Sequence, residues 1–164
     1  MKVQVTTLTQ ALALRLDELL DAEIQLKEAI PHCITKVSSD PLRQVLSAYA
    51  ESCSNKKQKL DRVYNHLMTA PKASKSKVID RLIKNTKDML KSSLTDEMRD
   101  VLLISCLQTI NHYKIAGYKT ALTFASELEL ETPADLLGEV LHWEQASEHK
   151  LSSIAMNDVN VKVF

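Results

Sequence analysis

The chain has 164 residues, of which 45% are hydrophobic and 26% are charged. It contains only two glycines and four prolines, and because glycine supplies the backbone of tight turns and phosphate loops, this composition excludes a dinucleotide-binding fold, a P-loop and a many-turned β sandwich. Lys plus Arg and Asp plus Glu both number 21, so the net charge gives no overall attraction to nucleic acid or to a membrane surface.

The first predicted helix covers residues 7 to 38, where apolar side chains recur every three or four positions. Pro31 removes one amide donor and predicts a kink or a break in its C-terminal half. Ser39 and the proline two residues later have the pattern of an N-cap followed by proline at the first helical position. They predict a second long helix over residues 41 to 69.

A linker at residues 69 to 74 separates the second helix from a shorter amphipathic helix, which is predicted near residues 75 to 91. Residues 93 to 97 then supply a capping side chain and acids suited to the positive end of a helix dipole. They predict a third long helix over residues 96 to 129. Gly117 within it is interpreted as a point of close helix packing.

Thr132 and Pro133 repeat the pattern of a cap followed by proline and predict a last helix over residues 133 to 156. The tail, residues 157 to 164, has no helical pattern. It is expected to dock on the bundle, or to mediate an oligomer contact, through Val159, Val161 and Phe164.

Four long helices with a short helix between the second and the third predict an all-α fold, a four-helix bundle with an elongated crossover, in one domain over residues 1 to 164. The three cysteines form no C-x-x-C motif and cannot all pair within one chain, which favours a reducing compartment. The N-terminus lacks a signal-peptide pattern, and no apolar run approaches the length of a membrane span. A soluble, cytoplasmic protein is expected.

The balanced charge hides an asymmetry along the chain. Residues 54 to 92 carry 11 Lys and Arg against 3 Asp and Glu, whereas both flanking regions are net acidic. The preferred interpretation is a solvated basic face, whose positive charge is balanced by acidic faces elsewhere in the fold or on a partner subunit. A protein partner at this segment is the alternative, and nucleic-acid binding is not favoured.

Polar residues on the inward stripes of the predicted helices are the most informative positions, because burial without a partner would be costly there. Glu23 lies on the stripe of the first helix, and Glu144 and Glu148 lie on that of the last. Asn111 and Lys114 share the stripe of the third helix. The second helix contributes Tyr49, Ser52, Cys53 and Lys56.

Carboxylates that converge from several helices build di-iron and di-manganese sites, usually together with Glu-x-x-His pairs. The sequence has no such pair, and three glutamates with a lysine among them fall short of the charge that two divalent ions require. Charge-assisted hydrogen bonds from Lys114 to Glu23, Glu144 or Glu148 are therefore the preferred interpretation. Surface exposure of some of these residues and a working metal site remain alternatives.

Three stretches carry a resemblance to a known family: LDAEIQL at residues 20 to 26 with the following Pro31, QTINHYKIAGY at 108 to 118, and LHWE at 141 to 144. On these motifs the chain resembles the YciE/YciF family of bacterial, stress-induced, ferritin-like four-helix proteins. The resemblance covers residues 7 to 160. It implies a ferritin-like bundle whose core carboxylates hold two non-haem iron or manganese ions.

The chain departs from this family pattern at several of the positions that the resemblance implies as metal ligands. Glu23 and Glu144 are retained, and Glu148 stands where the family has aspartate. A histidine and a glutamate of the family fall on the second helix, where a shift of one residue would bring in Glu51. The substituted positions are Tyr49, Ser52, Asn85, Asn111 and Lys114.

These departures predict a non-enzymatic, homodimeric bundle with a degenerate metal site, without a cofactor, in a stress-related or interaction role. The alternative is a di-iron or di-manganese ferroxidase or oxidase that uses Glu23, Glu144, Glu148 and Glu51 and requires Lys114 to leave the core. A third hypothesis is an adapter that presents the basic segment, residues 54 to 92, to an acidic partner.

Overall fold

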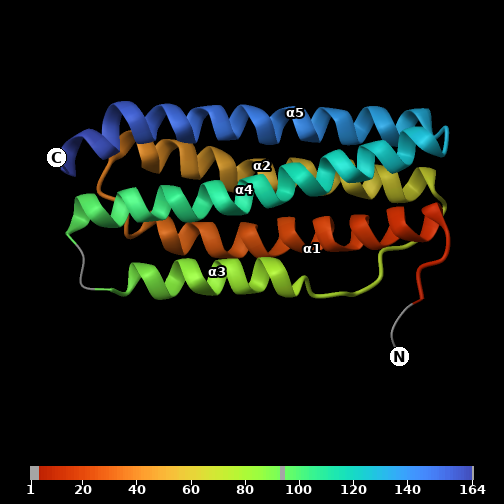
Figure 1. Ribbon diagram of the computed structural model, residues 1–164, viewed down its shortest axis with the longest axis horizontal. Helices are drawn as coiled ribbons and strands as arrows, with labels where there is room; N and C mark the ends of the chain where they lie inside the picture. The colour runs from red at the N-terminus through yellow and green to blue at the C-terminus, as the bar shows by residue number, and fades with distance from the viewer. Residues whose placement is uncertain (1–3, 93–94, 164) are drawn as a thin grey trace.

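A computed structural model describes residues 4–92 and 95–163, with the side chain of Val161 left aside (Figure 1). Within these ranges the chain forms five α-helices and no strand. The helices are α1 (Leu8–Ile34), α2 (Asp40–His66), α3 (Lys77–Leu90), α4 (Asp96–Glu127) and α5 (Glu131–Ile154).

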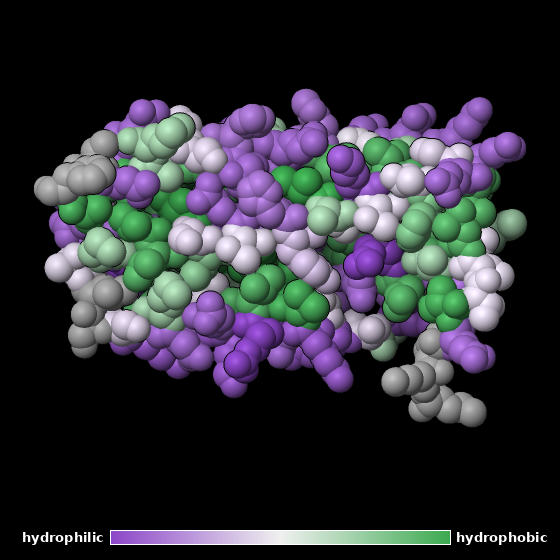
Figure 2. All heavy atoms as spheres, viewed as in Figure 1, coloured by the Kyte–Doolittle hydropathy of each residue, from purple (hydrophilic) through white to green (hydrophobic). Residues whose placement is uncertain are grey.

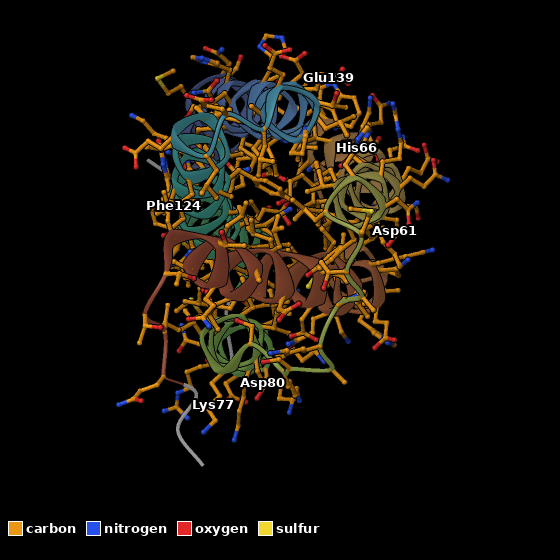
Figure 3. The ribbon with its side chains drawn as sticks, turned by 90° about the vertical axis from the view of Figure 1, so that its right-hand side faces the viewer. Asp61, His66, Lys77, Asp80, Phe124 and Glu139 are labelled. Atoms are coloured by element: carbon orange, nitrogen blue, oxygen red, sulfur yellow. The ribbon has the colours of Figure 1, made fainter. Side chains whose placement is uncertain are left out.

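Four of the helices, α1, α2, α4 and α5, form the bundle. Helix α1 packs against α2 and α4, and α5 packs against the same two helices. Figure 1 shows that the two helices of each neighbouring pair run antiparallel to one another. This is possible because α3 carries the chain back along the outside of the bundle before α4 begins. Seen end-on, α3 lies outside the square of four helices, next to α1 (Figure 3). This is the single-crossover, ferritin-like topology, and the predicted fold class is confirmed.

Side-chain caps explain why four of the helices begin where they do. The side chains of Thr7, Ser39, Ser76 and Thr95 each accept a hydrogen bond from the backbone amide three residues later. Each bond satisfies one of the amide donors that the first turn of a helix leaves without an intrahelical partner. The predicted cap at Ser39 is confirmed.

The start of α5 and the tail differ from the prediction. Helix α5 begins at Glu131 without a side-chain cap, so Thr132 is not the capping residue, and Pro133 lies in the first turn, where an amide donor is dispensable. The tail is not irregular either, since a π turn (Ala155–Val159) and a 3₁₀ turn (Asn160–Val163) continue α5. Val159 is buried as expected, while the Val161 side chain and Phe164 fall outside what the structure describes.

Helix α1 runs without interruption through Pro31 and ends at Ile34, so the predicted break is wrong and the predicted end at residue 38 is four residues late. One missing amide donor so close to the C-terminus of the helix costs few of its backbone hydrogen bonds.

A carboxylate from α4 fixes the corner between α1 and α2. Asp100 is buried and accepts hydrogen bonds from the amides of Ser38 (3.1 Å) and Ser39 (2.8 Å) and from the Ser38 hydroxyl (2.6 Å).

Two carboxylates of α1 hold the crossover against the bundle. Asp17 Oδ1 accepts hydrogen bonds from the Tyr64 hydroxyl at 2.6 Å and from the Lys72 amide at 3.0 Å. Asp21 Oδ2 accepts one from the Ser76 amide at 2.6 Å, immediately before α3 begins. The linker between α2 and α3 is therefore anchored in its middle, at Lys72, and at its end, at Ser76.

The apolar core of the bundle is divided into two clusters. One fills the half nearest the α1–α2 corner and includes Leu26, Leu46, Ile110 and Leu151. The other fills the half nearest the start of α1 and includes Leu12, Leu60, Ala121 and Leu137. A layer of buried polar side chains separates the two halves, and its charged and amide members are Glu23, Lys56, Asn111, Lys114 and Glu144.

The two glycines make a matched test of packing. A Cβ atom at Gly117 would lie 2.9 Å from Cδ2 of buried Leu19, whereas one at Gly138 would meet nothing within 4 Å. Replacing a helical glycine with alanine gains about 0.5–1 kcal/mol of stability, and overpacking costs about 1–3 kcal/mol. We therefore expect Gly138→Ala to raise the free energy of unfolding in urea and Gly117→Ala to lower it by about 1 kcal/mol. Equal stabilisation by both would contradict close packing at Gly117.

Candidate functional site

Four ionised side chains, one from each helix of the bundle, meet in the middle of the core. Lys114 Nζ on α4 lies 2.8 Å from Glu23 Oε1 on α1 and 2.6 Å from Glu144 Oε1 on α5. Lys56 Nζ on α2 lies 2.5 Å from the same oxygen of Glu144. All four side chains have no exposed surface. Two ammonium groups and two carboxylates thus alternate in a chain of zero formal charge, which we call the ion-pair layer.

Neutral polar groups complete the surroundings of the ion-pair layer. The Tyr118 hydroxyl donates a hydrogen bond to Glu23 Oε1 at 2.6 Å, and Asn111 Nδ2 donates one to Glu144 Oε2 at 2.6 Å. The Tyr49 hydroxyl donates to the same Glu144 oxygen at 3.3 Å and accepts from Lys114 Nζ at 3.2 Å.

Tyr49 also contributes its aromatic ring to the layer. The ring centroid lies 4.5 Å from Lys56 Nζ and 5.0 Å from Lys114 Nζ, within the range of cation–π attraction. The two ammonium groups are therefore stabilised by the face of the ring as well as by carboxylates. A single tyrosine links the two lysines with Glu144.

The electrostatics of the layer favour the ionised forms of Glu144 and Lys114. Burial by itself raises the pKa of Glu144, but the nearby Lys114 and Lys56 ammonium groups outweigh it and hold the pKa below its ordinary value. Burial by itself lowers the pKa of Lys114, but the Glu144 and Glu23 carboxylates hold it well above its ordinary value. Burial raises the pKa of the Cys53 thiol to about 12, with a further contribution from Glu23, so this thiol stays neutral.

The residues of the layer do not fit the metal pair that the family resemblance implies. An ion bound by both glutamates would need the space where Lys114 Nζ lies, within 2.8 Å of an oxygen of each. Two ammonium groups already balance the two carboxylates, and no imidazole belongs to the layer. In the part of the chain that the structure describes, no group of three His, Cys, Asp or Glu side chains is arranged to hold a metal ion.

The structure brings together most of the polar residues that the sequence places on inward stripes. Glu23, Tyr49, Asn111, Lys114 and Glu144 all meet in the layer, so the alternative of surface exposure is wrong for them. The predicted ion pairs of Lys114 form with Glu23 and with Glu144.

Glu148 lies apart from the layer. Its Oε1 accepts hydrogen bonds from Gln108 Nε2 at 3.1 Å and from the Ser152 hydroxyl at 2.8 Å, and its side chain is partly exposed. His112 Nε2 lies 3.5 Å from the same oxygen. Glu148 therefore belongs to a polar cluster at the edge of the α4–α5 contact, and the predicted pairing with Lys114 does not form.

Three further candidate positions also lie outside the layer. Ser52 donates a hydrogen bond to the Tyr49 carbonyl at 2.7 Å along α2, and Glu51 is exposed. Asn85 is exposed on α3, which lies outside the bundle. The inner line of α2 is instead Tyr49, Cys53, Lys56 and Leu60, at spacings of three and four residues.

Lys56 is the residue whose role the sequence does not predict. Its position on the inward line of α2 is visible, but nothing local shows that it pairs with Glu144, 88 residues later. Only charge balance could have indicated that Lys56 belongs to the layer, because two buried carboxylates require two cations and Lys114 supplies one.

The basic excess at residues 54 to 92 is partly neutralised within the fold. Besides buried Lys56, three lysines form ion pairs: Lys57 with Asp61, Lys59 with Glu139 and Lys75 with Asp80. The remaining exposed lysines are concentrated on and around α3, where Lys77 points away from the bundle (Figure 3). None of the helices, as far as the chain is described, has the length and hydropathy that a membrane crossing requires.

Removal of one ammonium group from the layer should destabilise the fold in a pH-dependent way. We expect Lys114→Met to cost about 3–5 kcal/mol at pH 7, because Glu23 keeps no cation. Since the folded-state pKa of Glu144 is lowered, its contribution is present above the ordinary pKa of 4.5 and is lost as the pH falls below that value. The difference between the wild type and Lys114→Met should therefore shrink in acid.

Urea unfolding between pH 3 and pH 8 checks this expectation. Lys119→Met, which removes an exposed lysine of the same helix, serves as the control and should change the free energy of unfolding by less than about 0.5 kcal/mol. A difference between Lys114→Met and the wild type that stays constant down to pH 3 would contradict the ion-pair layer.

Comparison with known proteins places the chain in a family. The model of a domain of unknown function, DUF892, matches residues 7–163. Protein YciF of Escherichia coli (strain K12) is 32% identical over 148 residues, which cover 90% of this chain and 89% of YciF. These similarities confirm the family resemblance predicted from the sequence motifs.

Solved structures show the same similarity in three dimensions. The crystal structure of YciF, an E. coli stress protein, matches with a TM-score of 0.92 at 30% identity, over 95% of this chain and 99% of that one. YcfI from Rhodopseudomonas palustris matches with a TM-score of 0.90 at 26% identity, over 94% and 99%. The chain therefore belongs to the DUF892 family and is a relative of YciF.

Proposed function

We propose that this chain is a non-catalytic helical bundle with a stress-related structural or interaction role, in which the ion-pair layer stands in place of a metal site. The observation that carries the proposal is the Lys114 ammonium group, which lies between Glu23 and Glu144. The relatives support the biological part, since YciF is described as a stress protein and the description of YcfI proposes a structural role.

The burial of the layer supports a role without catalysis. Its four ionised groups have no exposed surface, and each is engaged by an opposite charge within 2.8 Å. The cavity that borders Tyr49 measures about 10 Å³, at the lower limit of the space that one water molecule needs. A substrate would therefore have to open the core, and an oxidase would also have to expel Lys114 from two ion pairs.

Metal loading tests the proposal. Protein incubated anaerobically with ferrous iron or manganese(II) and then desalted should retain less than one equivalent, because Lys114 and Lys56 already balance the carboxylates. Iron oxidation in air should proceed no faster than in buffer. The double variant Asn111→Glu/Lys114→Glu is the positive control, since it replaces an amide and an ammonium group of the layer with carboxylates, and it should retain more metal. Retention of two ions by the wild type, lost in Glu23→Ala, would overturn the proposal.

The partner-binding surface of this proposal is the outer side of α3. Hydrophilic side chains gather along the edge of the molecule that α3 occupies (Figure 2), and Lys77 and Lys84 are exposed there. An acidic protein bound at this surface should dissociate steeply with salt. The reversals Lys77→Glu and Lys84→Glu should abolish its capture from a lysate, and unchanged capture would contradict the surface. The homodimer stays a prediction that sedimentation velocity checks.

A further inference from the structure

A cavity of about 530 Å³ opens where the ends of α1 and α3 meet the beginning of α4. These three helix ends lie together on the left in Figure 1. The cavity shares no residue with the ion-pair layer. Its described lining is His32, Cys33, Lys36, Lys87, Leu90, Lys91, Ser92 and Arg99.

The wall of this cavity is strongly basic. Lys36, Lys87 and Lys91 are exposed lysines that form no ion pair within the described residues, and no acidic side chain is among the described residues of the lining. Arg99 forms an ion pair with Asp96 at 2.7 Å, so together the two contribute no net charge.

Helix dipoles do not account for this charge. Basic residues are common in the last turn of a helix, where they offset a partial charge of about −0.5. Since α1 and α3 end at the cavity and α4 begins there, the three helix ends together offset about half of one of the three lysine charges. A charge of about +2.5 remains for a ligand, and a phosphate monoester dianion neutralises most of it.

The floor of the cavity has a different character. Cys33 is 5% exposed and Leu90 is half-buried, and both present apolar surface to the opening. Burial raises the pKa of the Cys33 thiol and the Lys87 ammonium group opposes this only in part, so the thiol is neutral at pH 7. The volume lies in the range of pockets that hold small organic ligands, which combine apolar walls with a few charged groups.

We propose that this cavity is a binding site for a small organic phosphate, a phosphate monoester with an apolar body. The phosphate is held by the ammonium groups of Lys36, Lys87 and Lys91, and the apolar body covers Cys33 and Leu90. Inorganic phosphate can bind the lysines of the wall, but it leaves the apolar surface of Cys33 and Leu90 exposed to water. The site is independent of the ion-pair layer. A negative result in the phosphate-binding test therefore leaves the proposed function intact, and a negative result in the metal-loading test leaves this site intact.

Titration of the full chain with phenyl phosphate tests this proposal. Calorimetry at 150 mM salt should show binding at least tenfold tighter than that of inorganic phosphate or of phenol alone. Backbone amide shifts should change at residues 32–36 and 87–92, which hold seven of the eight lining residues. The double variant Lys36→Ala/Lys87→Ala should weaken binding at least tenfold. Leu90→Ser should remove most of the preference for phenyl phosphate over inorganic phosphate.

The matched control is Lys27→Ala/Lys119→Ala, which removes the same charge from exposed positions of α1 and α4 that do not line the cavity. It should leave the affinity for phenyl phosphate within twofold of the wild type. Equal affinity for inorganic and phenyl phosphate, equal weakening by both double variants, shifts confined to other residues, or absence of binding would each overturn the proposal.

Discussion

The ion pairs among Glu23, Lys56, Lys114 and Glu144 are the constraint on which the rest of the bundle depends. An unpaired charge at this depth is strongly destabilising, so each helix must present its charged group at the same level as the other three. A slip of one helix by a single turn would displace its group by about 5.4 Å and break the layer. Helices that pack through leucine-rich faces alone would lose much less stability from such a slip. The layer thus fixes the register of four helices and divides the apolar core into two halves.

Other carboxylates fix the connections between the helices. Asp100 fixes the corner between α1 and α2, and Asp17 and Asp21 hold the crossover that leads into α3. Helix α3 contributes no side chain to the ion-pair layer and lies outside the four-helix square (Figure 3). The ion-pair layer is therefore closed and charge-balanced, while exposed lysines without an ion pair among the described residues lie on α3 and around the cavity at its end.

The helices could be predicted from the sequence because their causes are local. The apolar period and the caps at Ser39 and Thr95 act within a few residues, and with so few glycines and prolines the chain has little but long helices available. The ends that were missed have causes outside the segment. Helix α1 stops at Ile34, and the amides of Ser38 and Ser39 just beyond it donate hydrogen bonds to the Asp100 carboxylate of α4, more than 60 residues further along the chain. The tail continues as helical turns with Val159 packed in the core, although its own pattern is not helical.

The sequence by itself determined that the core contains charges, because polar residues such as Glu23 and Lys114 stand where the helical period demands burial. Only the tertiary structure decided which charges pair. Glu144 and Glu148 share one inward line of α5, yet only Glu144 enters the layer, and Lys56 becomes its partner although nothing local indicates this. The physical reason is that periodicity gives the face of a helix, whereas an ion pair needs contact within about 3 Å. Such contacts depend on the rotation and register of each helix against its neighbours, which packing of the whole bundle sets.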